Sequence, residues 1–130
     1  MSSRRLFLGK IAALMGIGAA APTVHATAPR TVELQRSPVA GFQYHQGEAV
    51  WSSLEVGTAL SLVREPDNRY DYRAVRVDWQ GQKLGYVPRS DNVAVSHLLD
   101  TGYALDAKIV ALQTSRDPWS RIELAIFLAA

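Results

Sequence analysis

Residues 64–92, REPDNRYDYRAVRVDWQGQKLGYVPRSDN, decide the fold because they combine a polar loop with two strand-like segments. Apolar and charged side chains alternate along residues 74–79, as in a strand with one buried face. Gln80 and Gly81 follow as a tight turn, since glycine tolerates the positive φ that such turns need. Residues 83–88 return as the partner strand. The stretch therefore predicts a β-hairpin that is entered through a polar loop.

Outside this hairpin the hydrophobic period is also mostly two, which favours strands. Further strands are expected at residues 40–47, 58–65, 104–112 and 121–129. Residues 49–57 fit either a short helix or a loop. One helix is expected over residues 91–101, with Ser90 as its N-cap and Gly102 at its C-terminal end.

These elements predict a mainly β domain, a six-stranded, partly open β-barrel with one or two short helices, one of which plugs an end. The chain has 130 residues, of which 48% are hydrophobic, and this suffices for one small domain of that kind. The core is expected to include Val75, Val77, Leu84, Ile109 and Ile122.

Residues 1–26 have the pattern of a signal peptide. Arg4, Arg5 and Lys10 precede an apolar run at residues 11–21, which is too short to span a bilayer. No other segment of the sequence is a candidate for a membrane span.

The segment SRRLFLG at residues 3–9 resembles the twin-arginine export motif. An ordinary secretory signal, or a basic tail with a hydrophobic patch, is the alternative. The pattern predicts a periplasmic or secreted protein, in which residues 27–39 form a linker to a domain at residues 40–130.

The charge of the expected mature chain argues against general attraction for phosphate. The full chain has 14 basic and 12 acidic side chains, and without residues 1–26 it has 11 against 12, a net charge of −1. A nucleic-acid site in such a domain depends on local placement of its cations rather than on the overall charge.

Several chemistries are excluded by the residues themselves. There is no cysteine, and therefore no disulfide, thiolate metal site or cysteine nucleophile. His45 and His97 have no metal-ligand spacing. Neither a Gly-x-Ser-x-Gly elbow nor a Gly-x-x-x-x-Gly-Lys loop occurs. We therefore expect a binding module rather than an enzyme, without a metal or cofactor.

Three segments, GFQYHQG (41–47), LVREPDNRYDYRAVRV (62–77) and KLGYVPR (83–89), resemble the HIRAN domain family. The resemblance implies an OB-like β-barrel. In DNA-remodelling helicases this domain is an accessory module that binds free 3′ ends of single-stranded DNA, so the resemblance implies single-stranded DNA ends as a partner.

The resemblance also implies roles for particular residues. Tyr44 and Tyr70 would stack on bases, and Asp71 would accept a hydrogen bond from the terminal sugar hydroxyl. Asn68, in the same loop, would support Asp71.

Two positions depart from the family pattern and reduce the charge available for phosphate. Gln43 stands where DNA-binding members have arginine, and Tyr86 stands where they have histidine. Tyr86 therefore replaces a cation in the expected ligand-binding set, whereas Arg89 still supplies one.

A different interpretation of the same loop stays open. Asp71 could instead bind loop amides while Tyr70 packs over the mouth of the barrel. The domain would then be an exported interaction module for an envelope protein or a small ligand. A continuous basic track through Arg64, Arg69, Arg73 and Arg89 would favour nucleic acid, and a neutral groove would favour the envelope module.

Overall fold

The computed structural model describes residues 31–129. The expected signal peptide at residues 1–26, and the expected linker as far as residue 30, lie outside the described residues. None of the helices within the described range has the length and apolar character needed to cross a membrane.

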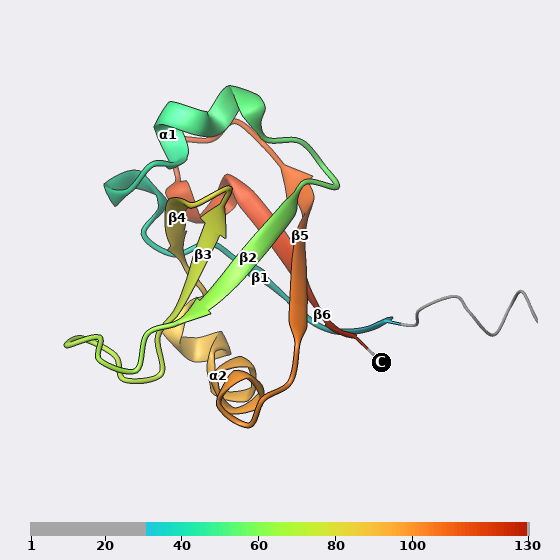
Figure 1. The fold of residues 1–130 in the computed structure, drawn as a ribbon. Helices are drawn as coiled ribbons and strands as arrows, with labels where there is room; N and C mark the ends of the chain where they lie inside the picture. The colour runs from blue at the N-terminus through green and yellow to red at the C-terminus, as the bar shows by residue number, and fades with distance from the viewer. Residues whose placement is uncertain (1–30, 130) are drawn as a thin grey trace, which may run out of the picture. The chain divides into compact units, whose positions relative to one another are not determined.

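Residues 31–129 form six strands, β1 (Thr31–Pro38), β2 (Ala59–Arg64), β3 (Val75–Trp79), β4 (Gln82–Tyr86), β5 (Leu105–Leu112) and β6 (Ile122–Ala129) (Figure 1). The same range contains the α-helices α1 (Gly47–Val50) and α2 (Val93–Asp100) and the 3-10 helices η3 (Phe42–Tyr44), η4 (Trp51–Ser53), η5 (Arg89–Asp91) and η6 (Pro118–Ser120). The strands lie in the order β1-β6-β5-β2-β3-β4, and all neighbours are antiparallel. A mainly β domain with six strands and two short α-helices is therefore confirmed.

The sheet is not closed into a barrel, which corrects the predicted architecture. The chain just after β1 meets β4 at an isolated bridge between Ala40 and Tyr86, with N–H···O distances of 2.8 and 2.9 Å. The bridge requires a glycine beside it, since a Cβ on Gly85 would lie 2.3 Å from the Ala40 oxygen. Alternation predicts which face of a strand is buried, but it does not predict whether two edge strands pair.

Residues 31–38, which the sequence placed in the linker, form β1 and pair with β6. A bulge in the middle of β1 shifts its register, and Val32 and Leu34 are both exposed. The strand therefore lacks a period-two pattern. Pro38 is tolerated because β1 lies at the edge of the sheet.

Residues 40–47 do not form the expected strand but contain η3 and the start of α1. Gly41 has a φ of 73°, in the left-handed region, where the chain turns after β1. Phe42 is fully buried whereas Tyr44 is exposed, so their alternation comes from a tight helical turn rather than from a pleat. Residues 49–57, which fitted either a helix or a loop, contain the end of α1 and all of η4.

Helix α2 lies within the predicted range, but its N-cap was placed wrongly. Asn92 is the N-cap and makes no side-chain capping bond, whereas Ser90 lies in η5. The predicted C-terminal end of the helix is confirmed, because Gly102 has a φ of 93°. The Gly102 N–H donates to the Leu99 carbonyl at 3.1 Å, and the Tyr103 N–H donates to the Leu98 carbonyl at 3.0 Å.

The hydrophobic core includes every core residue predicted from the sequence. Val75, Val77, Leu84, Ile109 and Ile122 are all buried, together with Phe42, Leu124 and Ile126. The predicted hairpin is also present, because β3 and β4 pair on either side of Gln80 and Gly81, with φ values of 46° and 80°.

Candidate ligand-binding pocket

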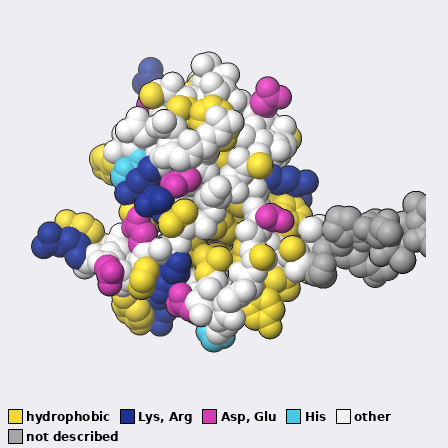
Figure 2. Space-filling model, viewed as in Figure 1, with side chains coloured by type: hydrophobic (Ala, Val, Ile, Leu, Met, Phe, Trp, Pro, Cys, Tyr) yellow, Lys and Arg dark blue, Asp and Glu magenta, His cyan; other side chains and the backbone are white. Residues whose placement is uncertain are grey.

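A pocket of about 540 Å³ lies between the 65–74 loop, β4 and η3. Its lining includes all six residues predicted to bind a ligand: Tyr44, Asn68, Tyr70, Asp71, Tyr86 and Arg89. Figure 2 shows charged side chains of both signs, with hydrophobic ones between them, on the side of the molecule where β4 and this loop lie. The predicted residues are therefore neighbours in space, although they come from three separate segments.

The loop that carries Tyr70 is held in shape by Asn68. The Asn68 side-chain oxygen accepts the backbone N–H groups of Tyr70 at 2.9 Å and Asp71 at 3.1 Å. The base of the loop is closed by the Glu65 N–H, which donates to the Ala74 carbonyl at 3.0 Å. Asn68 thus supports Asp71 through the backbone of the loop.

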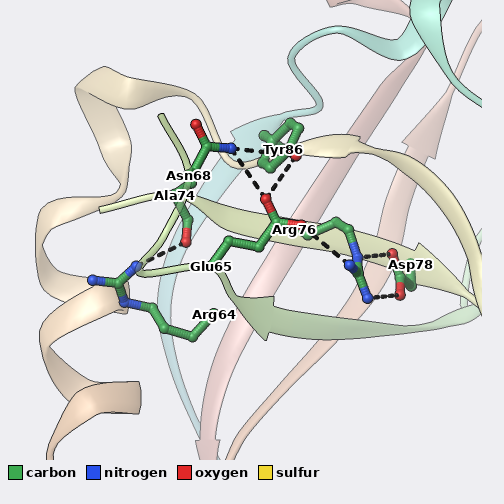
Figure 3. Close-up of polar contacts among 7 residues, drawn as sticks. All are labelled: Arg64, Glu65, Asn68, Ala74, Arg76, Asp78 and Tyr86. Carbon is green, nitrogen blue, oxygen red and sulfur yellow. Dashed lines mark hydrogen bonds and ion pairs between the residues drawn. The ribbon is translucent and has the colours of Figure 1, made fainter. Parts of the chain in front are cut away.

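Glu65 joins this loop to β3 and β4 (Figure 3). Its Oε1 accepts the Tyr86 hydroxyl at 2.8 Å and the Asn68 amide at 3.1 Å, and its Oε2 accepts Arg76 at 3.1 Å. Arg76 in turn forms a bidentate ion pair with Asp78, in which its Nε and Nη2 donate to the two carboxylate oxygens at 2.8 and 3.0 Å. Burial raises the pKa of the Glu65 carboxyl, but its hydrogen bonds outweigh burial and leave that pKa below its ordinary value.

Asp71 accepts one loop N–H, in partial agreement with the second interpretation of the sequence, and its other partner is a side chain at the start of α2. Its Oδ1 accepts the Arg73 N–H at 3.0 Å, and its Oδ2 accepts the Asn92 amide at 2.7 Å. Arg89 Nε lies 3.9 Å from the same Oδ2. The Asp71 side chain is 15% exposed and lines the pocket. A carboxylate has about four acceptor positions, so capacity for a ligand donor remains.

Tyr70 does not pack over the core, which contradicts the other half of that interpretation. Its exposed fraction is 79%, and that of Tyr44 is 77%. Arg69 Cζ lies 5.7 Å from the centre of the Tyr70 ring. Both tyrosines border the pocket with their rings largely free, an arrangement suited to stacking on flat ligands.

The basic track expected through four arginines is only partly present. Arg64 is turned away to the Tyr72 carbonyl at 2.8 Å and to Asp100 at 3.0 Å, and neither it nor Arg73 lines the pocket. Arg69 and Arg89 do line it. The charge of the pocket lining therefore matches neither the continuous basic track nor the neutral groove that the two interpretations of the sequence expect.

Sequence reasoning missed Lys83, which is a third cation in the lining. Asp78 pairs with Lys83 and Val77 with Gly85, so Leu84 is an extra, bulged residue in β4. The bulge puts Lys83 on the same face as Tyr86, whereas strict alternation would put them on opposite faces. Lys83 Nζ lies 4.6 Å from the centre of the Tyr86 ring.

His45 and Glu65 were also missed as parts of the site. His45 lines the pocket and meets the Tyr86 ring edge-on, with 5.9 Å between ring centres. Among residues 31–129 no cluster of three or more histidine and acidic side chains is arranged to hold a metal ion.

Comparison with known proteins places this geometry in a family. A crystal structure of a protein from Lactobacillus plantarum is similar to the chain, with 30% sequence identity and a TM-score of 0.68, over 78% of this chain and 98% of that one. The crystal structure of the HIRAN domain of human HLTF shares the fold, with a TM-score of 0.60 and 18% identity over 77% and 79% of the two chains. No curated protein matches the chain.

The HIRAN domain family matches residues 32–130, which include the whole pocket and every strand except the first residue of β1, Thr31. All three segments that suggested the family from the sequence lie inside this match. The chain therefore belongs to the HIRAN domain family.

Proposed function

We propose that this domain binds the free 3′ end of single-stranded DNA in the pocket. Tyr44 and Tyr70 stack on bases, and Asp71 accepts the terminal hydroxyl. One observation supports the proposal above all: residues from three segments converge on one pocket, with two tyrosine rings left almost fully exposed. HIRAN domains are non-catalytic modules in known proteins, which agrees with binding rather than turnover.

The chemistry of the lining suits such an end. Stacking on an aromatic side chain contributes about 1–3 kcal/mol per base and tolerates any base. The Asp71 carboxylate is a strong acceptor for a hydroxyl donor, and Asn92 and Arg73 hold it in place. Arg69, Lys83 and Arg89 surround the pocket with positive charge although the expected mature chain is nearly neutral.

Fluorescence anisotropy with short oligonucleotides tests the proposal. The wild-type chain should bind a 3′-hydroxyl end more tightly than a 3′-phosphate end, because the phosphate would meet the Asp71 carboxylate. Tyr70→Ala should lose roughly 1–3 kcal/mol of binding to both ends. Asp71→Ala should abolish the preference for the free hydroxyl while the stacking remains.

Tyr103→Ala is the matched control, since Tyr103 is also exposed but does not line the pocket. Its affinity should equal that of the wild type. Equal affinity of the wild type for both ends would contradict the role of Asp71. Absence of binding at micromolar protein in low salt would contradict the proposal as a whole and favour a module for an envelope protein.

A further inference from the structure

Lys83 is one of several cations in the described range that have no carboxylate partner. Arg64, Arg76 and Arg121 each lie within 3.1 Å of an acidic oxygen. Within residues 31–129, no acidic oxygen lies within 4.0 Å of the Lys83 ammonium. Asp78 faces Lys83 across the ladder, but both of its oxygens bind Arg76. The charge of Lys83 is thus available at the pocket wall.

His45 contacts the Tyr86 ring, over which the Lys83 ammonium also lies. The backbone N–H of Gln46 donates to the Lys83 carbonyl at 2.8 Å, which fixes the end of η3 against β4. The His45 imidazole contacts the edge of the Tyr86 ring at an interplanar angle of 71° and lies over Gly41. Lys83 and His45 therefore both contact the Tyr86 ring and both line the pocket, and neither is hydrogen-bonded to Asp71.

The anchoring of Tyr86 makes this end of the pocket rigid. The Tyr86 hydroxyl donates to Glu65, and the negative charge of Glu65 is compensated by Arg76. Burial lowers the pKa of the His45 imidazole and the Lys83 ammonium lowers it further, while Glu65 acts in the opposite direction. An anion placed between Lys83 and His45 would offset both effects that lower this pKa.

We propose that Lys83 and His45 form a phosphate subsite that holds one internucleotide phosphate of the strand bound in the pocket. The inference rests on the proposed function and extends it, because it assigns a second polar contact in the same pocket in addition to the one at Asp71. Lysine provides a compact positive charge with three donors, and a neutral imidazole provides one N–H donor, or two when protonated. The ligand chemistry is a phosphodiester, and a free phosphate ion is the other source of the same chemistry.

A double-mutant cycle with modified oligonucleotides tests this contact. Each of the last linkages at the 3′ end is replaced in turn by an uncharged methylphosphonate, and affinity is measured for the wild type and for Lys83→Gln. Replacement of one particular linkage should lower the affinity of the wild type severalfold. The same replacement should leave the affinity of Lys83→Gln unchanged, because that variant already lacks the contact. Lys83→Gln should also reduce the slope of log K against log salt by about 0.7.

Lys108→Gln is the matched control, because Lys108 lies over Phe127 and does not line this pocket. It should keep the wild-type response to every modified linkage. Additive losses at all linkages in Lys83→Gln would overturn the subsite. Displacement of the oligonucleotide by an equimolar amount of inorganic phosphate would show that the site takes the free ion, and would overturn the assignment to an internucleotide phosphate.

The pH dependence tests His45 separately. A bound phosphate raises the pKa of His45, so binding takes up a proton and affinity increases as the pH falls from 8 toward 5. The charged groups that act on His45 are Lys83 and Glu65, and the lowered pKa of Glu65 keeps its carboxylate ionised over this range. His45→Gln should abolish the increase, and an unchanged pH profile would overturn its role. A domain that keeps its preference for a 3′-hydroxyl but shows neither effect retains the proposed function and loses only this subsite.

Discussion

At the scale of single residues, Glu65 connects the loop beside the pocket to the sheet. Its carboxylate accepts hydrogen bonds from a loop residue, from β3 and from β4, so it fixes three parts of the pocket at once. Removal of such an acceptor leaves partly buried donors without partners, which costs more than the hydrogen bonds themselves contribute.

Glu65→Ala should therefore lower the free energy of unfolding by about 1–3 kcal/mol, measured by urea denaturation. Glu55→Ala is the control, because Glu55 is exposed and its side chain makes no hydrogen bond with other residues of the described range. A stability loss no larger than that of the control would mean that the network is not needed for folding.

The pH dependence of stability follows from the same carboxyl. The pKa of Glu65 in the folded domain is below its ordinary value of 4.5, so the unfolded chain binds a proton more readily. The stabilisation from Glu65 is present above the unfolded pKa and disappears as the pH falls through the lower folded pKa. Glu65→Gln should accordingly lose less stability than the wild type between pH 6 and pH 3, as measured by thermal unfolding at each pH.

At the scale of the elements, the bridge between Ala40 and β4 depends on Gly85, which has no side chain. A Cβ on Gly85 would lie 2.3 Å from the Ala40 oxygen and 2.7 Å from Val39 Cγ1. Because the closer atom belongs to the backbone, the crowding is not relieved by a rotamer change. The chain segments themselves would have to separate.

Gly85→Ala should therefore destabilise the fold by more than Gly102→Ala, as compared by their denaturation midpoints. Gly102 has a positive φ but open space around it, so alanine there costs only about 1 kcal/mol of backbone strain. Equal midpoints for the two variants would contradict the importance of the contact at Ala40.

Strands could be predicted from the sequence where most of their apolar side chains face the core, including β5, although its register shifts between Ile109 and Ala111. β3, β5 and β6 bury the expected side chains, and Gly102 ends α2 as predicted. Prediction failed where a bulge or a tight turn moves side chains off the face that alternation assigns to them. The bulge in β1 hid that strand, and the bulge at Leu84 hid the place of Lys83 in the pocket.

The residues that line the pocket were predicted more completely than the architecture of the sheet around it. The resemblance to a family named six lining residues, because each of the three motifs that carry them is a short continuous stretch of sequence. Whether a sheet closes, and whether Tyr70 packs or stays exposed, depends on contacts between segments distant in sequence. Residue patterns along one segment do not contain that information.

At the scale of the whole molecule, residues 1–26 carry three cations and the rest of the chain has a net charge of −1. We propose that residues 1–26 direct export by the twin-arginine route. A reporter fused to residues 1–30 should cross the inner membrane, and changing both Arg4 and Arg5 to Lys should stop it, because guanidinium groups and not charge alone are recognised. Lys10→Arg is the control and should be exported normally.

Continued export of the double-lysine variant would exclude that route and leave an ordinary secretory signal. Retention of both fusions in the cytoplasm would exclude a signal peptide altogether.

The bridge between Ala40 and Tyr86 has a consequence for the order in which the chain acquires its structure. It joins the two edges of the sheet, whose residues are far apart in sequence, and it closes a long loop of chain for only two hydrogen bonds. Loop closure of this kind is favourable only after the local hairpins have formed. We therefore expect the pocket to form late in folding, and a ligand that binds there as proposed would stabilise only chains that have completed this step.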